Sequence, residues 1–272
     1  MKSAALMQHP LVWKGVNLVE LYKGKGALTD QAAYRDIALC SVPGKAVSRM
    51  VRRRAAQVMH EAALETMFGS GLNGGGTDFG HLYVRACADV AEVRGKSFVA
   101  LFLDAVAAFA MVCRAVVLPV PETEATLGRR LREAGLRDEE IAQTLADLQF
   151  YVDHGDKAWE KQGCSDHLRL AMAALMTNTW ASFDGSDRVV RTSTGTMAGS
   201  PLSDLLFSLL MVRLLLSLRA ELKAEGLVPS MERTRKTCML TGVPWPSNML
   251  ELFEASLVDD VAIPLVGKAG EM

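Results

Sequence analysis

The stretch SLVDDVAIPLV, residues 256–266, places two adjacent aspartates, Asp259 and Asp260, between two short apolar runs. The flanking runs predict a β-hairpin whose tip carries the two carboxylates. A buried carboxylate is costly unless it is paired or coordinates a metal. The pattern therefore indicates either a solvated turn or a metal site close to the end of the sequence.

A third aspartate, Asp104, ends the apolar run KSFVALFLD at 96–104, which predicts a buried central strand. Carboxylates at strand ends suit oxygen-preferring cations such as Mg²⁺. Asp104, Asp259 and Asp260 would be a minimal ligand set for two ions that activate an attacking hydroxyl and neutralise a leaving pyrophosphate. The plainer alternative is that Asp104 caps a helix and the aspartate pair lies in a solvated turn.

The composition limits the classes of protein that the chain can represent. It has 272 residues, is 50% hydrophobic and carries a formal net charge of −1, so it holds one large domain or two small ones. Near-zero charge argues against nucleic-acid binding through bulk charge, but Arg49 and Arg52–Arg54 make one predicted helix basic and able to follow a phosphate backbone. The 5 cysteines occur singly, which argues against a zinc module and suits reduced thiols inside a cell.

Two apolar stretches, 97–120 and 201–218, approach the length of a membrane span. Charged residues interrupt both of them: Asp104, Arg114, Asp204 and Arg213. A spanning helix needs about 20 apolar residues with few or no charges. Buried core is therefore favoured for both stretches, with a membrane protein as the rival interpretation.

The rest of the chain predicts a mixture of strands and helices, and we expect an α+β fold. The predicted elements are a strand over 11–21, a turn at Pro43-Gly44 before a basic helix from Lys45, a helix over 78–94, mostly helical structure over 122–188, and a long helix that starts at Ser200-Pro201 and is closed by Gly226.

Several motifs resemble those of reverse transcriptases, and they occur in the same order. FVALFLDAVAAF (98–109) is similar to the first palm motif, GTMAGSPLSDLLFSLL (195–210) to the next, and SLVDDVAI (256–263) to the third. Upstream, LVELYKGKG (18–26) with YRDIALCSVPGKAVSRMVRRR (34–54) resembles the fingers segment of non-LTR, LINE-like retrotransposon enzymes, and GSGLNGGGTDFGHLYV (69–84) resembles their glycine-rich element.

This resemblance implies the fingers and palm of a right-hand polymerase, with an antiparallel palm sheet and helices packed on it. Residues 1–95 would be the fingers-like region. Residues 96–272 would be the palm, made of 96–120 and 189–272 with a helical insertion at 121–188. The reaction would be RNA-directed DNA synthesis, in which a primer 3′-hydroxyl attacks the α-phosphate of a dNTP. The partners would be an RNA template, a DNA primer and dNTPs, with no membrane.

The resemblance also implies a role for each motif residue. Asp104, Asp259 and Asp260 would hold two Mg²⁺ ions, with Mn²⁺ as the alternative metal. The backbone carbonyl of Ala105 would help to hold them. The nucleotide contacts would be Lys25 and Arg35 to the triphosphate, Phe109 under the sugar, and Gly199, Ser200 and Pro201 beneath the template–nucleotide pair. The plainer alternatives are a core aromatic for Phe109 and a solvated loop pair for Lys25 and Arg35.

The sequence departs from the family pattern at defined positions. Ala198 stands where the motif has glutamine, Leu257 where it has an aromatic residue, and Asp36 where it has proline. No thumb follows the third motif within these residues, so we expect a fragment or a decayed copy of a larger retroelement, nuclear or cytoplasmic if the element is eukaryotic. The rival interpretations are a catalytically dead, nucleic-acid-binding remnant and a helical domain with chance matches.

Overall fold

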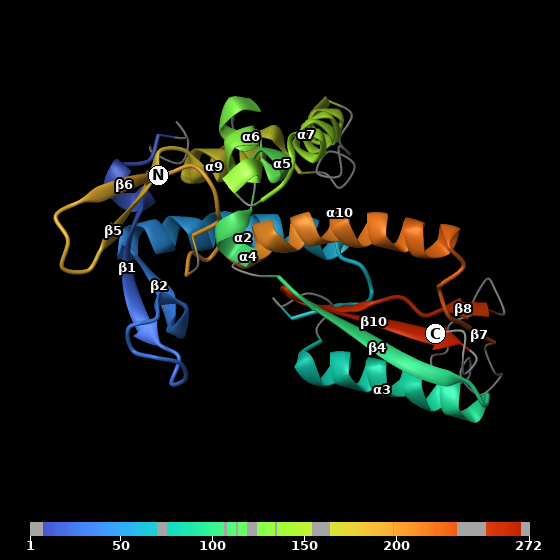
Figure 1. Cartoon of the computed structure of the whole chain (residues 1–272). Coiled ribbons are helices and arrows are strands. Elements are labelled where there is room, and N and C mark those ends of the chain that lie inside the picture. The colour runs from blue at the N-terminus through green and yellow to red at the C-terminus, as the bar shows by residue number, and fades with distance from the viewer. Residues whose placement is uncertain are drawn as a thin grey trace. The chain divides into compact units, whose positions relative to one another are not determined.

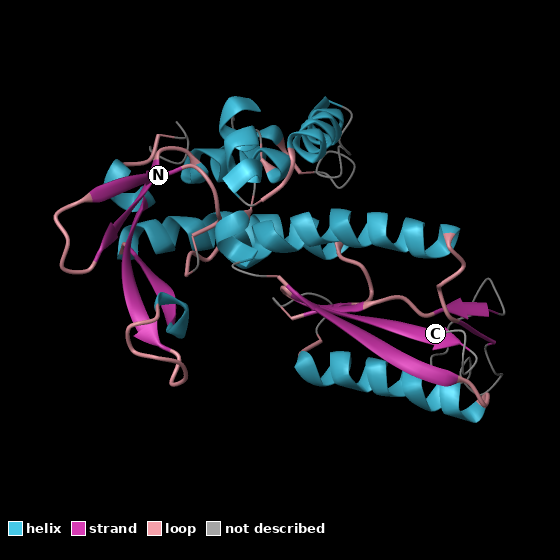
Figure 2. Cartoon of the chain, viewed as in Figure 1, coloured by secondary structure: helices cyan, strands magenta, loops and turns pink. Residues whose placement is uncertain are grey.

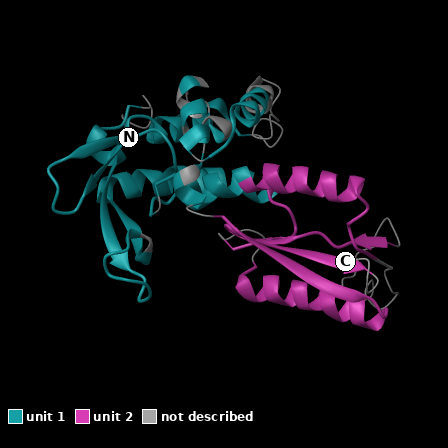
Figure 3. Ribbon diagram, viewed as in Figure 1, with its two compact units in different colours: residues 1–62, 107–210 teal, residues 63–106, 211–272 magenta. Residues whose placement is uncertain are grey.

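The computed structural model describes residues 8–69, 75–105, 108–112, 114–118, 124–133, 135–153, 164–197, 199–232 and 249–267. Its helices and strands confirm the expected α+β class (Figure 2). The chain forms two compact units, one of residues 1–62 and 107–210 and the other of residues 63–106 and 211–272 (Figure 3). These units interleave along the sequence, and the expected fingers and palm regions remain a prediction.

The first unit contains a four-stranded sheet of order β2-β1-β5-β6 (Figure 1). Its strands are β1 (Gly15–Tyr22), β2 (Tyr34–Cys40), β5 (Thr179–Phe183) and β6 (Val189–Thr192). Strand β1 pairs antiparallel with β2 and parallel with β5. The predicted strand over 11–21 was wrong at its start, because Leu11–Lys14 form the 3-10 helix η1 after Pro10.

The helices described in the first unit include η2 (Gln31–Ala33), α2 (Val42–Ala62), α4 (Ala108–Met111), α5 (Arg114–Val117), α6 (Glu124–Glu133), α7 (Asp138–Asp153) and α9 (Asp166–Met176). The turn predicted at Pro43-Gly44 lies inside α2 instead. Proline is tolerated in the first turn of a helix, and the Ser41 hydroxyl accepts the Gly44 N–H at 3.2 Å as an N-cap. The segment 121–188 is not purely helical, because β5 lies within it.

The second unit contains a sheet of order β3-β9-β10-β4. Its strands are β3 (Met67–Phe68), β9 (Ala255–Leu257), β10 (Asp260–Gly267) and β4 (Ser97–Asp104), and β10 runs antiparallel to both of its neighbours. Helix α3 (Thr77–Val93) lies on one side of this sheet and the second half of α10 (Ser203–Ala224) on the other (Figure 3). A small hairpin of β7 (Ser230–Glu232) and β8 (Met249–Glu251) completes the unit.

Strand β4 was predicted to be central and buried, and that prediction was wrong about its position. It is the last strand in the sheet order, with Phe102 72% exposed and Leu101 46% exposed. Strand β10 takes the central place, and its Val261 and Ala262 are buried although they point to opposite faces. An apolar run shows that a strand forms but does not show which strands flank it.

Helix α10 begins at Ser203, later than the predicted start at Ser200-Pro201. Its predicted end is confirmed, because Gly226 has a φ of 67° and donates its N–H to the Lys223 carbonyl at 3.1 Å. None of the helices in the described residues has both the length and the apolar character that crossing a membrane requires.

Candidate functional site

The three predicted aspartates come together within the second unit. Asp104 at the end of β4 is the direct cross-strand partner of Asp260 at the start of β10. Directly opposed residues of antiparallel strands have Cα atoms about 4.5–5.5 Å apart and side chains on the same face. Asp259 precedes Asp260 in the turn between β9 and β10, so the predicted hairpin tip is confirmed.

The turn that carries Asp259 is strained. Leu257 pairs with Asp260, which leaves Val258 and Asp259 as a two-residue connection. Val258 has a φ of 60°, a region in which a β-branched residue is an outlier. Such strain persists only where surrounding structure holds it, and it clusters at functional sites. The aspartate tip is therefore a position that the rest of the unit must hold in place.

Like charges dominate the electrostatics of the tip. Loss of solvation raises the pKa of the Asp260 carboxyl above its ordinary value, and the neighbouring carboxylates of Asp259 and Asp104 raise it further. Oxygen donors of this kind fit a hard divalent cation. Yet within the ranges that the structure describes, no set of three His, Cys, Asp or Glu side chains is arranged to hold a metal ion. The register makes Asp104 and Asp260 cross-strand neighbours.

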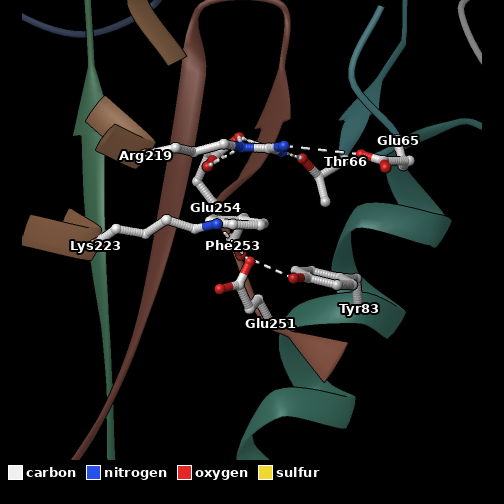
Figure 4. Close-up of polar contacts among 8 residues, drawn as sticks. All are labelled: Glu65, Thr66, Tyr83, Arg219, Lys223, Glu251, Phe253 and Glu254. Carbon is white, nitrogen blue, oxygen red and sulfur yellow. Dashed lines mark hydrogen bonds and ion pairs between the residues drawn. The ribbon is translucent and has the colours of Figure 1, made fainter. Parts of the chain in front are cut away.

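A buried ion pair anchors the chain just before β9. Glu254 is fully buried, and Arg219 of α10 donates to both of its carboxylate oxygens at 2.9–3.1 Å (Figure 4). The Arg219 guanidinium also donates to the Thr66 hydroxyl at 2.6 Å and lies 4.3 Å from the centre of the Phe253 ring. Tyr83 of α3 donates its hydroxyl to the Phe253 carbonyl at 2.8 Å. These contacts hold the strand that leads into the aspartate turn from both α10 and α3.

The predicted Gly199-Ser200 loop lies in the first unit, against β2. A Cβ atom at Gly199 would lie 2.5 Å from the Ala38 carbonyl oxygen, and its φ is 94°, so only glycine fits there. Ser200 is buried, and its hydroxyl accepts the Leu202 N–H at 3.4 Å. Ala198, the substituted motif position, lies outside the described residues.

Buried Arg114 organises the chain that leads to this loop. Its guanidinium donates to the carbonyls of Met176, Thr194 and Gly195 at 2.6–2.7 Å and to the Thr179 hydroxyl at 2.7 Å. The residue is 2% exposed. It therefore ties α5 to the end of α9, to β5 and to the turn before Gly199.

The remaining predicted nucleotide contacts also lie in the first unit, except for Ala105. Phe109 is half-buried, and its ring packs on Phe207 at 5.2 Å between centroids. Arg35 is exposed on β2 opposite Leu21 of β1, and Lys25 is exposed in the loop between these strands. Ala105 follows Asp104 in the second unit and is exposed. The structure thus brings the metal-binding candidates together in one unit and most of the nucleotide-binding candidates in the other.

The basic helix α2 divides its arginines between two uses. Arg49, Arg53 and Arg54 are exposed. Arg52 instead forms an ion pair with Asp204 and donates to the Pro201 carbonyl at 2.7 Å. Arg52 is therefore held by the start of α10.

Two important side chains, Arg219 and Glu254, were not singled out from the sequence. Arg114 was noticed only as a charge that interrupts an apolar stretch. That signal, a charged residue inside an apolar run, points to a buried and bonded side chain, but it does not identify the partner. Comparison with known proteins finds no protein family and no curated protein that matches this chain.

Proposed function

We propose that the second unit is the metal-binding palm of a template-directed nucleotidyltransferase of the reverse transcriptase type. The observation that supports this most strongly is the register of β4 and β10, which sets Asp104 opposite Asp260 with Asp259 in the adjoining turn. These residues lie more than 150 positions apart in sequence, and the motif order anticipates their meeting. A solvated turn alone does not explain why a carboxylate from another strand lies beside the pair.

Asp104, Asp259 and Asp260 would hold the divalent ions, with the Ala105 carbonyl as a further oxygen ligand. When bound, Mg²⁺ or Mn²⁺ supplies activation of a primer hydroxyl and neutralisation of the leaving pyrophosphate. The aspartates themselves provide the negative charge that concentrates cations at the tip. Because the pKa of Asp260 is raised, this carboxylate loses its negative charge at a higher pH than an ordinary aspartate does.

The first unit would supply the contacts to nucleic acid and nucleotide. Arg35 and Lys25 offer cationic groups that complement a triphosphate. The Gly199 turn lies against Ala38 of β2, and the same strand carries Arg35. Phe109 would lie under the incoming sugar. The substrates are accordingly an RNA template, a DNA primer and dNTPs.

A second candidate function is a catalytically inactive, nucleic-acid-binding remnant of the same fold. It is favoured by one observation, that the described ranges contain no group of three or more His, Cys, Asp or Glu side chains that could hold a metal ion. The exposed arginines of α2 would still contact a phosphate backbone in such a protein. The two candidates differ in whether the chain catalyses nucleotidyl transfer.

Two measurements separate these candidates. One is primer extension on an RNA template, and the other is Mn²⁺ binding monitored by electron paramagnetic resonance. The catalytic proposal expects extension by the wild type and a loss of about 100-fold or more in Asp259→Asn, the scale for removing one preorganised electrostatic group. Asp187→Asn, at an exposed position in the β5–β6 connection, is the matched control and should extend primers normally.

Other results of the extension and Mn²⁺-binding measurements support the inactive remnant or contradict the metal-binding palm. Mn²⁺ binding that Asp259→Asn abolishes, without any extension, supports the inactive remnant. Wild-type protein that binds no Mn²⁺ at millimolar concentration contradicts the metal-binding palm. Equal extension by wild type and Asp259→Asn also contradicts it, because the activity then does not depend on the aspartates.

A further inference from the structure

The second unit contains an apolar groove whose walls, apart from two aspartates at one end, have no role in the proposed chemistry. It has a volume of about 680 Å³ and lies between α3 and the sheet. Cavities of about 300–1,000 Å³ with mostly apolar walls are typical of small-molecule sites. Its apolar lining includes Phe68, Val84, Ala88, Phe98, Phe102 and Leu257.

One end of this groove is acidic. Residues alternate between the faces of a strand, so Phe98, Phe102 and Asp104 project from the same face of β4. Asp260, opposite Asp104, projects from that face too, and both carboxylates line the groove. Among the described residues, neither carboxylate has a hydrogen bond or ion pair with a cationic side chain.

The wall formed by α3 does not neutralise this end. Helix α3 is followed by a short turn into β4, so the start of the helix lies at the Asp104 end of the strand. Thr77 and His81 line the groove from that start. Arg85 lines it one turn further along and forms an ion pair with Asp89 at 3.0 Å. The groove is thus mostly apolar, with Arg85 on its α3 wall, and it carries two carboxylates at one end.

We propose that this groove binds an amphipathic organic cation, with an aromatic body packed on Phe98 and Phe102 and an ammonium group against Asp104 and Asp260. The apolar body gains free energy by leaving water. The ammonium group gains from the two carboxylates, which repel one another in its absence. An anion with the same body meets like charge, and an uncharged analogue gains only from the apolar contact.

The ligand and a divalent ion would compete, because both need Asp104 and Asp260. This part of the inference rests on the proposed function, and it makes the ligand an inhibitor of metal-dependent catalysis. Binding of the cation itself needs no nucleotidyl transfer. The two claims can therefore fail separately.

The test compares three probes that share one body: biphenylmethylammonium, biphenylmethanol and biphenylacetate. We expect calorimetric titration of the full chain to give an affinity for the ammonium probe at least about 10-fold above that for the alcohol, which is about 1.4 kcal/mol. The carboxylate probe should bind most weakly. Equal affinities for the three probes would overturn charge recognition at the acidic end.

Substitutions in the groove test where the probes bind. The double variant Asp104→Asn/Asp260→Asn should bind the ammonium and alcohol probes equally, and Ala88→Phe should fill the groove and abolish binding of both. Leu82→Ala, on the same helix but outside the groove, is the matched control and should bind as the wild type does. Retained ammonium preference in the double variant, or retained binding in Ala88→Phe, would overturn the proposal.

A measurement on the wild type alone covers the case in which a variant does not fold. With selectively labelled methyl groups, nuclear Overhauser contacts should join the bound biphenyl to Val84 and Leu257, and contacts to Leu82 instead would reject the groove. Added Mg²⁺ should weaken binding of the ammonium probe and not of the alcohol. An ammonium affinity that Mg²⁺ does not change overturns the competition, and counts against the metal site rather than against the groove.

Discussion

The two units each bury a charged side chain next to a candidate loop, and they satisfy that charge in different ways. In the first unit, Arg114 donates to backbone carbonyls and hydroxyls that precede the Gly199 loop. In the second unit, Glu254 accepts from Arg219 just before the aspartate hairpin. The positive charge of Arg114 is thus shared among neutral hydrogen-bond acceptors from several segments, whereas the negative charge of Glu254 is paired with one oppositely charged side chain, Arg219.

This difference indicates how each loop depends on its support. Removing Arg114 leaves several buried oxygens without a donor at once, and each costs free energy. Removing Arg219 leaves one buried carboxylate, which is strongly destabilising but can be relieved by replacing Glu254 as well. The first unit should therefore respond to loss of its buried charge more steeply, and with less scope for rescue.

The largest effect should come from Arg114→Met. We expect the free energy of unfolding to fall by about 5 kcal/mol, because several buried acceptors each lose about 1–3 kcal/mol when left unsatisfied. Urea denaturation followed by circular dichroism measures the loss. Arg114→Lys keeps the charge but has fewer hydrogen-bond donors, so its free energy of unfolding should lie between those of the wild type and Arg114→Met. A loss below about 1 kcal/mol for Arg114→Met would show that water replaces the guanidinium.

Arg219→Met should cost about 3–5 kcal/mol, since it leaves the Glu254 charge buried and uncompensated. The double variant Arg219→Met/Glu254→Leu should be more stable than Arg219→Met by the same denaturation assay. Arg85→Met is the matched control, because its pair with Asp89 is exposed and such pairs contribute about 0.5 kcal/mol or less. Additive losses in the double variant would mean that the pair does not act as a unit.

The backbone of the two loops differs as well, and Gly199→Ala tests the first unit. We expect a loss of about 2 kcal/mol or more from the positive φ and from the approach of the new Cβ to the Ala38 carbonyl. Gly226→Ala is the control, because it has a positive φ of 67° but nothing within 4 Å of its Cβ position. Equal losses in thermal or urea unfolding would show that the contact with Ala38 contributes nothing.

The opposite change in the second unit, Val258→Gly, should stabilise the protein by about 1 kcal/mol. Relief of strain at a φ of 60° is worth about 1–3 kcal/mol, and the greater freedom of glycine in the unfolded chain offsets about 0.4–1 kcal/mol. The same urea measurement tests this. Destabilisation would mean that packing of the Val258 side chain outweighs the strain.

The smallest effect concerns the pH dependence of the aspartate tip. Because the folded-state pKa of Asp260 is raised, ionising it disfavours the folded state as the pH rises through that value. Asp260→Asn should therefore be more stable than the wild type near pH 7 by less than about 1 kcal/mol, since the site is exposed and screened. The difference should vanish below the ordinary aspartate pKa, near pH 4. A variant that is less stable than the wild type near pH 7 would contradict this sign.

The comparison also shows how far sequence reasoning reached. The run before Asp104 predicted a strand, and the pair at 259–260 predicted a hairpin tip; both elements are present. Alternation and turn residues are local signals, so they carry this information. The edge position of β4 and the bonds of Arg114 and Glu254 involve partners distant in sequence, and no local pattern specifies them.

The amino-acid sequence by itself determined the α+β class, the hairpin that carries Asp259 and Asp260, and the strand that ends at Asp104. Backbone propensity and apolar periodicity are properties of short stretches of sequence, and they determine where such elements form. Only the tertiary structure decided that β4 pairs with β10 in the register that opposes Asp104 to Asp260, and that an apolar groove ends at those carboxylates. Register and cavities arise from the packing of whole faces, because burial rewards the combined arrangement of distant segments rather than any one of them.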